Sequence, residues 1–397
     1  MSYLDQLLQG SEVEWKALGE AVNLQRGSRL IKSQLEETGK YAVYQNAMTP
    51  LGYYHLCNVK ASTTFIICAG AAGEIGFSDV DYWAADDITF CITPDYINNR
   101  FIYYFLQTQQ HKILSQVRRA SVPRLSKSVL EKLIIPIPPL SVQKEIVRIL
   151  DTFTELTAEL TAELTAELTA RKKQYNYYRE QLLMVNGEGL MNNEKVEWKT
   201  LGEVIVKSYS GSTPQAGNPK FYENGTIPWL RTQEVRFTDI YNTELNITDF
   251  ALKNTATKWI PTNCVIIAIS GATAGRSAIN KIPLTTNQHC LCLEINPKKA
   301  LYRYVFHWVI YNYENIKGLG QGARGDLNST MIKNLKIPIP SLEEQARIVS
   351  ILDKFDTLTT SISEGLPKEI ELRKKQYAYY RDQLLDFNKL KIDNEKR

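Results

Sequence analysis

The sequence predicts an α/β (α+β) protein in which two globular domains are joined by two long antiparallel helices and related by a pseudo-twofold internal repeat. Three observations lead to this expectation. Motifs of the first half return in the same order in the second half, each half ends in a long helical pattern, and apolar β-rich runs lie between the motifs. A chain of 397 residues is also long for a single domain.

Four motifs define the repeat. They are EWKALGE at 14–20 and EWKTLGE at 197–203, LIIPIPPL at 133–140 and LKIPIPSL at 335–342, IVRILDTF at 146–153 and IVSILDKF at 348–355, and RKKQYNYYREQLL at 171–183 and RKKQYAYYRDQLL at 373–385. The first pair is offset by 183 residues (197 − 14), and the other three by 202 (335 − 133, for example). The second copy is therefore 19 residues longer (202 − 183), and all of this length lies between its EWK and PIP motifs.

A third, partial copy lies near the start of the chain. YLDQLL at 3–8 matches YREQLL at 178–183 and YRDQLL at 380–385. The chain thus begins with the last residues of the unit that it later completes, as a cyclic arrangement does when it is cut open. We expect the N- and C-terminal segments to lie close together.

The two long helices are predicted from apolar spacing. From Leu140 to Leu183, apolar residues follow a spacing of three and four, no Gly or Pro interrupts, and Ser141 is the candidate N-cap. The second helix, from Leu342 to Phe387 with Ser341 as its cap, contains Gly365 and Pro367, which should kink or break it. The spacing from Phe153 to Arg171 equals that from Phe355 to Arg373, so in the first copy the run TELTAELTAELTAELTA (154–170) takes the place of the kink.

Between the motifs the sequence indicates strands and shorter helices. Three apolar runs predict strands: TTFIICAG (63–70), CVIIAISG (264–271) and CLCLEI (290–295). Helical patterns follow at Arg100–Val117 and Tyr302–Ile316. AGAAGEIG (69–76) and SGATAGRS (270–277) each follow a strand, and we interpret them as strand-to-strand turns.

Composition and motifs point away from membranes, metals and catalysis. The longest apolar run, near Phe65–Ala69, is too short to span a bilayer, and MSYLDQLLQGSEVEW has no signal-peptide pattern. The six cysteines form no C-x-x-C pair, so we expect them to be reduced in a cytoplasmic protein; His289, Cys290 and Cys292 lack the spacing of a metal site. No catalytic constellation is found, and GLGQGARGD follows a helix, which favours a connector over a nucleotide loop.

Basic side chains gather in both variable regions, whereas residues 154–170 contain none. Because Arg and Lys bind DNA phosphates, and Arg and amide groups read base edges, these residues are candidates for DNA contacts. Any one such residue, taken alone, is more often a solvated surface charge. The candidates are Arg26, Arg29, Lys32, Arg118, Arg119, Arg124, Lys127, Arg231, Arg236, Arg276 and Arg324, with Asn287 and Gln288.

With this frame in view, the sequence resembles the specificity (S) subunits of type I restriction-modification systems along essentially its whole length. The resemblance is carried by the EWK and PIP motifs and the TAEL run, together with GTIPW (225–229), QKEIVRILDTF (143–153), EEQARIVSILDKF (343–355) and SEGLPKEIELRKKQYAYYRDQLL (363–385). The TAEL run is similar to the central spacer of one subclass.

The resemblance implies a division of labour along the chain. Residues 1–141 and 186–342 would be target recognition domains, with variable regions at 20–132 and 204–334, each reading one half of a bipartite asymmetric DNA target. Residues 142–185 and 343–388 would be spacer helices that dock two modification (M) subunits, followed by a tail at 389–397. This non-catalytic chain would bind no cofactor and no membrane. S-adenosylmethionine would bind the M subunits, which methylate adenine, and ATP and Mg would serve the restriction (R) subunits.

The repeated RKKQYxYYRxQLL motif has two interpretations. Its tyrosines and leucines at helical spacing either pack against the other helix and the N-terminal copy or form a docking surface for the M subunits. The candidates are Tyr175, Tyr178, Leu182, Tyr377, Tyr380 and Leu384.

The TAEL run has the geometry of a ruler. Four helical residues rise about 6 Å and turn about 400°, a net rotation of about 40°, whereas a DNA base pair rises about 3.4 Å and turns about 34–36°. One unit thus nearly matches one base pair in rotation. A generic solvated coiled-coil segment is the alternative for this run, and a duplicated coiled-coil adaptor without DNA binding is the alternative for the whole chain.

Overall fold

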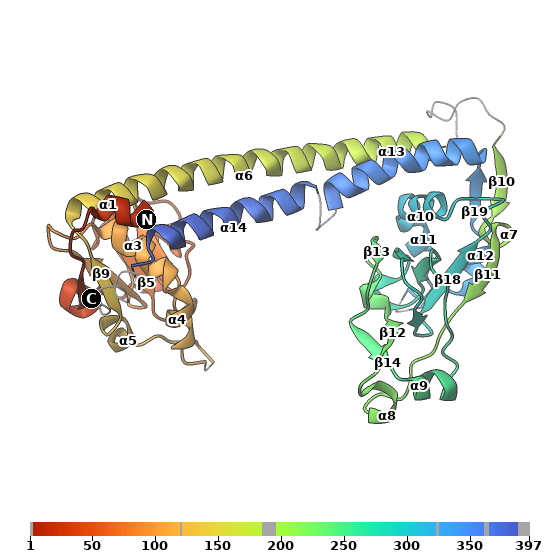
Figure 1. Ribbon diagram of the computed structural model, residues 1–397, viewed down its shortest axis with the longest axis horizontal. Coiled ribbons are helices and arrows are strands. Elements are labelled where there is room, and N and C mark those ends of the chain that lie inside the picture. Colours follow the sequence, from red (N-terminus) through yellow and green to blue (C-terminus); the bar gives the residue numbers. More distant parts are fainter. Residues whose placement is uncertain (1–2, 120, 185–195, 323–324, 361–364, 388–397) are drawn as a thin grey trace. The chain divides into compact units, whose positions relative to one another are not determined.

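The computed structural model describes residues 3–119, 121–184, 196–322, 325–360 and 365–387, and these form two compact units. Unit 1 contains residues up to Leu164 together with those from Glu369 onward, and unit 2 runs from Thr165 to Lys368. Each unit holds one globular domain and one portion of each long helix (Figure 1). In the described part of the chain, no helix has both the length and the apolar character of a membrane span.

The EWK and PIP motifs form the base of each domain because they are partner strands. In unit 1, β1 (Glu14–Ala17) pairs antiparallel with β9 (Ile134–Ile137), and Trp15 lies opposite Pro136. In unit 2, β10 (Glu197–Thr200) pairs in the same register with β19 (Lys336–Ile339). Segments more than 100 residues apart therefore close each domain, and this explains why the two motifs recur together.

The two domains share one plan of sheets. In unit 1 the strands form a four-stranded sheet, β2-β8-β5-β6, and a three-stranded sheet, β4-β3-β7; in unit 2 they form β11-β18-β15-β16-β13 and β14-β12-β17. The bounds in unit 1 are β2 Asn23–Arg26, β3 Tyr41–Tyr44, β4 Gly52–Tyr54, β5 Thr63–Ile67, β6 Ile75–Ser78, β7 Trp83–Ala84 and β8 Ile88–Ile92. Those in unit 2 are β11 Ile205–Tyr209, β12 Ile227–Leu230, β13 Asp239–Ile240, β14 Leu245–Ile247, β15 Val265–Ala268, β16 Ser277–Asn280, β17 Thr285–Thr286 and β18 Cys290–Ile295.

The 19 extra residues of the second copy lie in the connections of these sheets. The offset between equivalent strands rises from 183 at the EWK strands to 186 at β3 and β12, 193 at β4 and β14, and 202 at β6 and β16. The insertions hold β13 and the short helix α9 (Asp249–Asn254), which have no counterpart in unit 1. The second domain thus keeps the scaffold of the first and differs in its loops.

Short helices surround the sheets of each domain. They are α1 Tyr3–Leu8, α2 Leu18–Ala21, η1 Lys32–Gln34, α3 Asn99–Thr108, α4 Gln110–Ser115 and α5 Lys127–Glu131 in unit 1, and α7 Leu201–Val204, α8 Pro219–Tyr222, η2 Thr232–Glu234, α9, η3 Gly271–Thr273, α10 Tyr302–Tyr311, α11 Tyr313–Gly318 and α12 Ser329–Lys333 in unit 2. The expected single helices at Arg100–Val117 and Tyr302–Ile316 are wrong in one respect. Each is broken, at Gln109 and at Asn312, where the backbone leaves the helical region with ψ of 1° and 12°.

The long helices are α6 (Leu140–Leu183), α13 (Leu342–Thr360) and α14 (Leu366–Leu384). The expected interruption is confirmed, because α13 ends before Gly365, whose φ of 82° is not helical; residues 361–364 lie outside the described part. Ser341 caps α13, since its hydroxyl accepts the Glu344 N–H at 3.2 Å. Ser141 does not cap α6, because that helix already begins at Leu140 and the Pro139 carbonyl accepts the first N–H groups.

The core of unit 1 joins the two ends of the chain. Leu4 and Leu8 of α1 belong to the same buried cluster as Leu384, Leu385 and Phe387 at the end of α14. The expectation that the N- and C-terminal segments lie close together is therefore confirmed for the described residues. In unit 2 the equivalent leucines of α6, Leu182 and Leu183, occupy the corresponding cluster.

Candidate nucleic-acid interface

The four-stranded sheet of unit 1 has two ends of different character. Thr63 lies opposite Ser78 at the end that meets the long helix, and Arg26 lies opposite Thr89 at the other end. At this second end the segment 118–125 joins the sheet, because Arg124 bridges to Ala69 and to Arg118, and the Leu125 N–H donates to the Cys68 carbonyl at 2.8 Å. The structure therefore brings Arg26, Arg118, Arg124 and Lys127, far apart in the sequence, to one end of one domain.

A cavity of about 170 Å³ opens at this end of the sheet, and we call it the basic cavity. Its lining residues are Arg26, Cys68, Ala69, Asp86, Asp87, Thr89, Arg124, Leu125 and Lys127. The Arg26 Nε donates to the Asp86 carbonyl at 2.5 Å, which directs the guanidinium into place. Three cations beside two carboxylates supply donors for phosphate or guanine and acceptors for the amino group of cytosine or adenine.

The cysteine of this cavity is held by a hydrogen bond inside the domain. The Cys68 thiol donates to Thr89 Oγ1 at 3.3 Å, and burial raises its pKa, so the thiol stays neutral. In the described residues no group of three or more metal-ligating side chains is placed to hold an ion.

The loop after β2 carries two further candidates, Arg29 and Lys32, both exposed. Gly27 holds this loop against the domain, because a Cβ at this position would lie 2.2 Å from the Ala85 carbonyl oxygen. The Trp83 indole N–H also donates to the Ser28 carbonyl at 2.9 Å. These contacts position the loop beside the basic cavity. Arg119, also exposed, lies in the neighbouring 118–125 segment.

In unit 2 the equivalent end of the sheet has different chemistry. Asp326 takes the place of Arg124, at the same offset of 202, and the Leu327 N–H donates to the Ile269 carbonyl as Leu125 does to Cys68. Asp326 accepts hydrogen bonds from the Ser270 hydroxyl at 2.6 Å and the Gly271 N–H at 3.3 Å. The two domains therefore present an arginine and an aspartate at matching positions.

The amide candidates of unit 2 differ in accessibility. Asn287 is buried, and its Oδ1 accepts the His289 N–H, so its side chain serves the turn before β18. Gln288 is exposed, and its Oε1 accepts from the Thr213 hydroxyl at 2.6 Å. Arg276 precedes β16 at the same end of the sheet, and Arg324 lies outside the described residues.

Arg231 and Arg236 of unit 2 belong to an ion-pair cluster with Glu234 and Glu244. Arg231 Nη2 is 2.7 Å from Glu244 Oε2 and its Nε is 3.6 Å from Glu234 Oε1, so its charge is compensated within the domain. Arg236 lines a hollow of about 730 Å³ that also reaches Arg303 and Asp356. The backbone nevertheless places these arginines near the other candidates of unit 2. The Asn287 N–H donates to the Leu230 carbonyl at 3.1 Å, next to Arg231, and the Phe237 N–H donates to the Ser277 carbonyl at 2.8 Å, between Arg236 and Arg276.

The docking candidates divide into buried and exposed residues. Tyr175 and Tyr178 stack on Phe355 with ring centroids 6.1 and 5.5 Å apart, and Leu182 and Leu384 are buried in the domain cores. For these four, packing is the role that the structure shows. Tyr377 and Tyr380 line a groove of about 200 Å³ along α6 and α14 of unit 1, where the Tyr377 hydroxyl lies 2.9 Å from Thr154 Oγ1.

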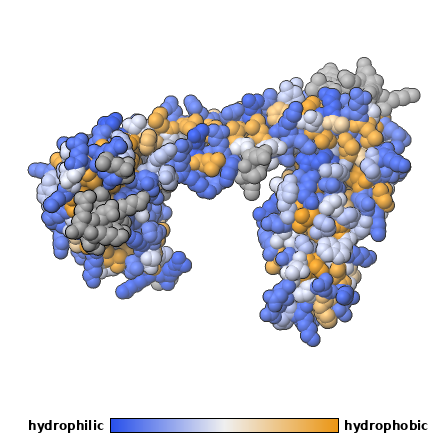
Figure 2. All heavy atoms as spheres, in the orientation of Figure 1, coloured by the Kyte–Doolittle hydropathy of each residue, from blue (hydrophilic) through white to orange (hydrophobic). Residues whose placement is uncertain are grey.

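Sequence reasoning missed the most exposed aromatic residue of the repeated motif. Tyr177 and Tyr379, at equivalent positions of the two copies, are 58% and 61% exposed. The signal was present, because this tyrosine lies off the apolar face and yet recurs in both copies. Apolar side chains also reach the surface along the long helices (Figure 2). Leu156 and Leu372 are 55% and 51% exposed.

A duplicated frame, a spacer helix in each copy and two domains that differ in their loops define a two-domain recognition protein. The family model described as type I restriction modification DNA specificity domain matches twice, over residues 10–170 and 193–372. The chain therefore belongs to the type I restriction-modification specificity subunits, a family of non-catalytic subunits.

Two relatives are similar over nearly the whole length. The EcoR124I/EcoR124II specificity subunit of Escherichia coli is 38% identical, covering 98% of each chain. A putative type I restriction enzyme specificity subunit of Haemophilus influenzae is 36% identical, covering 98% of this chain and 99% of the relative. Among solved structures, the S subunit from M. genitalium (TM-score 0.54, 19% identity, 97% and 99% coverage) and a chain from a study of type I R-M complex assembly (0.66, 15%, 94% and 98%) share the fold.

Proposed function

We propose that this chain reads a bipartite, asymmetric DNA target, with residues 1–141 recognising one half and residues 186–342 the other. The observation that carries the proposal is the exchange of Arg124 for Asp326 at equivalent ends of two sheets that share the order of their first four strands. Two domains with one scaffold and opposite charges at the same position suit two different sequences, because arginine favours guanine and carboxylates favour the amino group of cytosine.

Residues 142–185 and 343–388 act in this proposal as the spacer that docks two M subunits, to which R subunits add. The names of the relatives, specificity subunits of type I restriction enzymes, support partners of these classes. S-adenosylmethionine, ATP and Mg belong to the partners. For the docking surface we favour Tyr177, Tyr379 and Tyr380, because these tyrosines are exposed in the repeated motif.

The DNA contacts are tested by replacing Arg26 and Arg124 with glutamine in the complex with the M subunits. Two lost phosphate contacts would lower the slope of log affinity against log salt by about 1.8, whereas lost base contacts would relax specificity in one half-site by about 1–3 kcal/mol per pair. Lys172→Gln, an exposed residue of the spacer helix, is the control. If the wild-type complex shows no salt-dependent affinity for DNA, the chain is an adaptor and the proposal fails.

A further inference from the structure

Each spacer helix holds its recognition domain at two points, and the same two points occur in both units. The first is a buried glutamine. Gln143 accepts the Asn98 N–H at 2.8 Å and donates to the Pro138 carbonyl at 2.7 Å. Gln345, at the offset of 202, accepts the Leu301 N–H at 2.8 Å and donates to the Pro340 carbonyl at 2.9 Å. Each glutamine thus holds the start of the helix that covers the sheet, α3 or α10.

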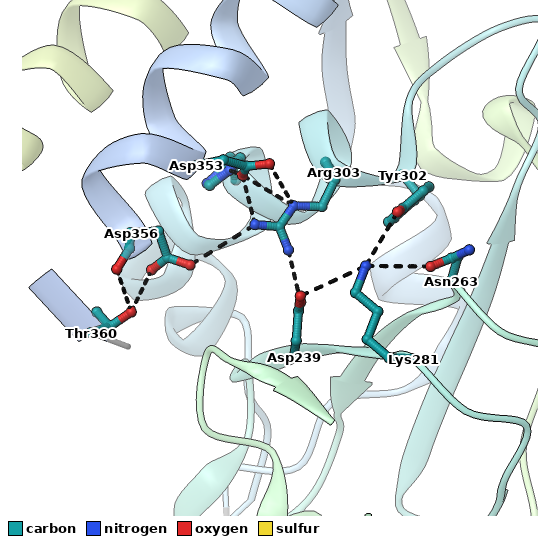
Figure 3. Close-up of polar contacts among 9 residues, drawn as sticks. Asp239, Asn263, Lys281, Tyr302, Arg303, Asp353, Asp356 and Thr360 are labelled. Atoms are coloured by element: carbon teal, nitrogen blue, oxygen red, sulfur yellow. Dashed lines mark hydrogen bonds and ion pairs between the residues drawn. The ribbon is translucent and has the colours of Figure 1, made fainter. Parts of the chain in front are cut away.

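The second point is an aspartate eight residues further along the spacer helix. In unit 1, Asp151 Oδ1 lies 2.7 Å from Arg100 Nε and accepts from the Tyr104 hydroxyl at 2.6 Å. In unit 2, both carboxylate oxygens of Asp353 accept from Arg303 Nε at 3.1 Å, and Oδ1 also accepts from Arg303 Nη2 at 2.6 Å (Figure 3). The same Oδ1 lies 2.6 Å from His307 Nε2. We call Asp151 and Asp353, with their arginines, the aspartate clamps.

In both units the clamp arginine also contacts a second carboxylate, but the residue that supplies this carboxylate differs. In unit 1, Arg100 Nη1 lies 2.7 Å from Asp79, which directly follows β6. The equivalent residue after β16 is Lys281, and in its place Asp239 of the inserted strand β13 accepts from Arg303 Nη1 at 2.7 Å. Lys281 itself lies 3.7 Å from Asp239 (Figure 3). Both copies therefore keep an arginine between a carboxylate of the domain and one of the spacer helix.

The unit 2 clamp is the more enclosed of the two. The Arg303 side chain is 15% exposed, and Asp356 Oδ2 adds a third carboxylate at 3.9 Å. Burial raises the pKa of Asp353, but the hydrogen bonds from His307 and Arg303 outweigh it, so the pKa of Asp353 is lowered overall. A charged, forked contact of this kind fixes geometry as well as charge.

Two contact points on one helix fix the angle between the domain and the helix, whereas with a single contact point the domain can rotate about it. Eight helical residues separate the glutamine and the aspartate by about 12 Å. A release of about 2 Å at the aspartate would turn the domain by about 10° about the glutamine. The basic cavity lies at the far end of strands about 17 Å long, so the reading end would move by about 3 Å. This displacement is close to the rise of one base pair, about 3.4 Å.

We propose that Asp151 and Asp353 are positioning residues that set the angle of each recognition domain on its spacer helix and so determine how strictly the protein fixes the gap between its half-sites. The inference rests on the proposed function, because it presupposes a bipartite target. It assigns a role in spacing to residues that are not among the candidate DNA contacts. Apolar packing of Ile146 and Leu150, or of Ile348 and Leu352, holds the domain on the helix but does not direct it.

The test compares methyl transfer by the complex with M subunits on duplexes whose gap is the preferred length, one base pair shorter or one longer. Asp151→Asn and Asp353→Asn should reduce the preference for the correct gap at least fivefold, with both half-site sequences unchanged. Glu159→Gln, an exposed carboxylate of the same spacer, should leave the preference as in the wild type. Unchanged gap preference in both asparagine variants would overturn the inference.

A second pair of variants decides the matter if an asparagine variant does not assemble. Arg100→Lys and Arg303→Lys keep the charge and the stem but lose the fork, so they should fold and still broaden the accepted gap. Strict spacing in both lysine variants would equally overturn the inference. If the wild-type complex itself methylates no bipartite sequence, the proposed function fails. If the wild type methylates only one gap length and the variants do the same, the proposed function stands and only this inference fails.

Discussion

Deletion of one TAEL unit is the sharpest perturbation of the spacer. The three units are identical, so removing any one of them gives the same sequence. They lie within α6, which is helical without a break over 44 residues, so the four residues removed are helical. The deletion shortens the helix by about 6 Å and leaves a net rotation of about 40° between the flanking segments.

The expected change in the gap between the half-sites follows from comparing the helical repeat of the α-helix with that of DNA. One base pair turns by about 34–36° and rises about 3.4 Å. The rotation of one unit thus matches one base pair to about 5°, and the shift along the axis exceeds it by about 2.6 Å. We expect the chain with two units to prefer a gap one base pair shorter, with each half-site unchanged.

The deletion should not unfold the protein, because the repeated leucines contribute little to the core. Their stripe drifts by about 40° per unit, and the burial follows it: Leu156 is 55% exposed, Leu160 and Leu168 are half-buried, and Leu164 is buried. At most one buried leucine is lost, which is worth about 1.5–3 kcal/mol. In the second copy, α13 ends at Thr360 and α14 begins at Leu366.

The assay is methyl transfer by the assembled complex on a series of duplexes that differ only in the gap. The chain with two units should prefer the duplex whose gap is one base pair shorter over the duplex with the wild-type gap by at least tenfold, equivalent to about 1.4 kcal/mol. The length-preserving variant Leu156→Ala is the control. An unchanged preferred gap in the deleted chain, with activity retained, would refute the ruler argument.

Three further predictions address the core, the docking surface and the thiols. Leu352→Ala, at a fully buried position, should lower the free energy of unfolding by about 2–5 kcal/mol, whereas Leu372→Ala, 51% exposed, should change it by about 0.5 kcal/mol or less in chemical denaturation. Tyr177→Ala with Tyr379→Ala should weaken M-subunit binding in calorimetry without shifting the melting temperature; full-strength binding would exclude this surface. Burial raises the pKa of Cys91 and Cys290 to about 12, so at pH 8 a thiol reagent followed by mass spectrometry should label partly exposed Cys57 well before either, and equal rates would contradict this burial.

The scaffold could be predicted from the sequence because it is written twice. The EWK and PIP motifs recur at fixed positions, and they proved to be partner strands. The long helices followed from apolar spacing, and the Gly365 interruption from backbone chemistry. The breaks at Gln109 and Asn312 could not be predicted, because neither residue is a helix breaker and tertiary packing decides where these helices turn.

The sequence predicted candidates for DNA contacts by residue type, but it did not predict which of them lie together in the fold. Arg26, Arg124 and Lys127 were candidates for their charge, but only the pairing of segment 118–125 with Ala69 shows that they share a cavity. The compensation of Arg231 by Glu244 depends on an inserted loop, and no local pattern marks it. The clamp aspartates were invisible for the same reason, because Asp151 and Arg100 are 51 residues apart.

The central claim, that each domain reads half of one target, is tested most directly by sequencing the methylated sites in cells that express this chain with its M subunit. The account predicts one asymmetric sequence in two parts with a gap of fixed length, and exchange of residues 20–132 for those of another specificity subunit should change one part alone. A continuous target, or a change in both parts after the exchange, would contradict it.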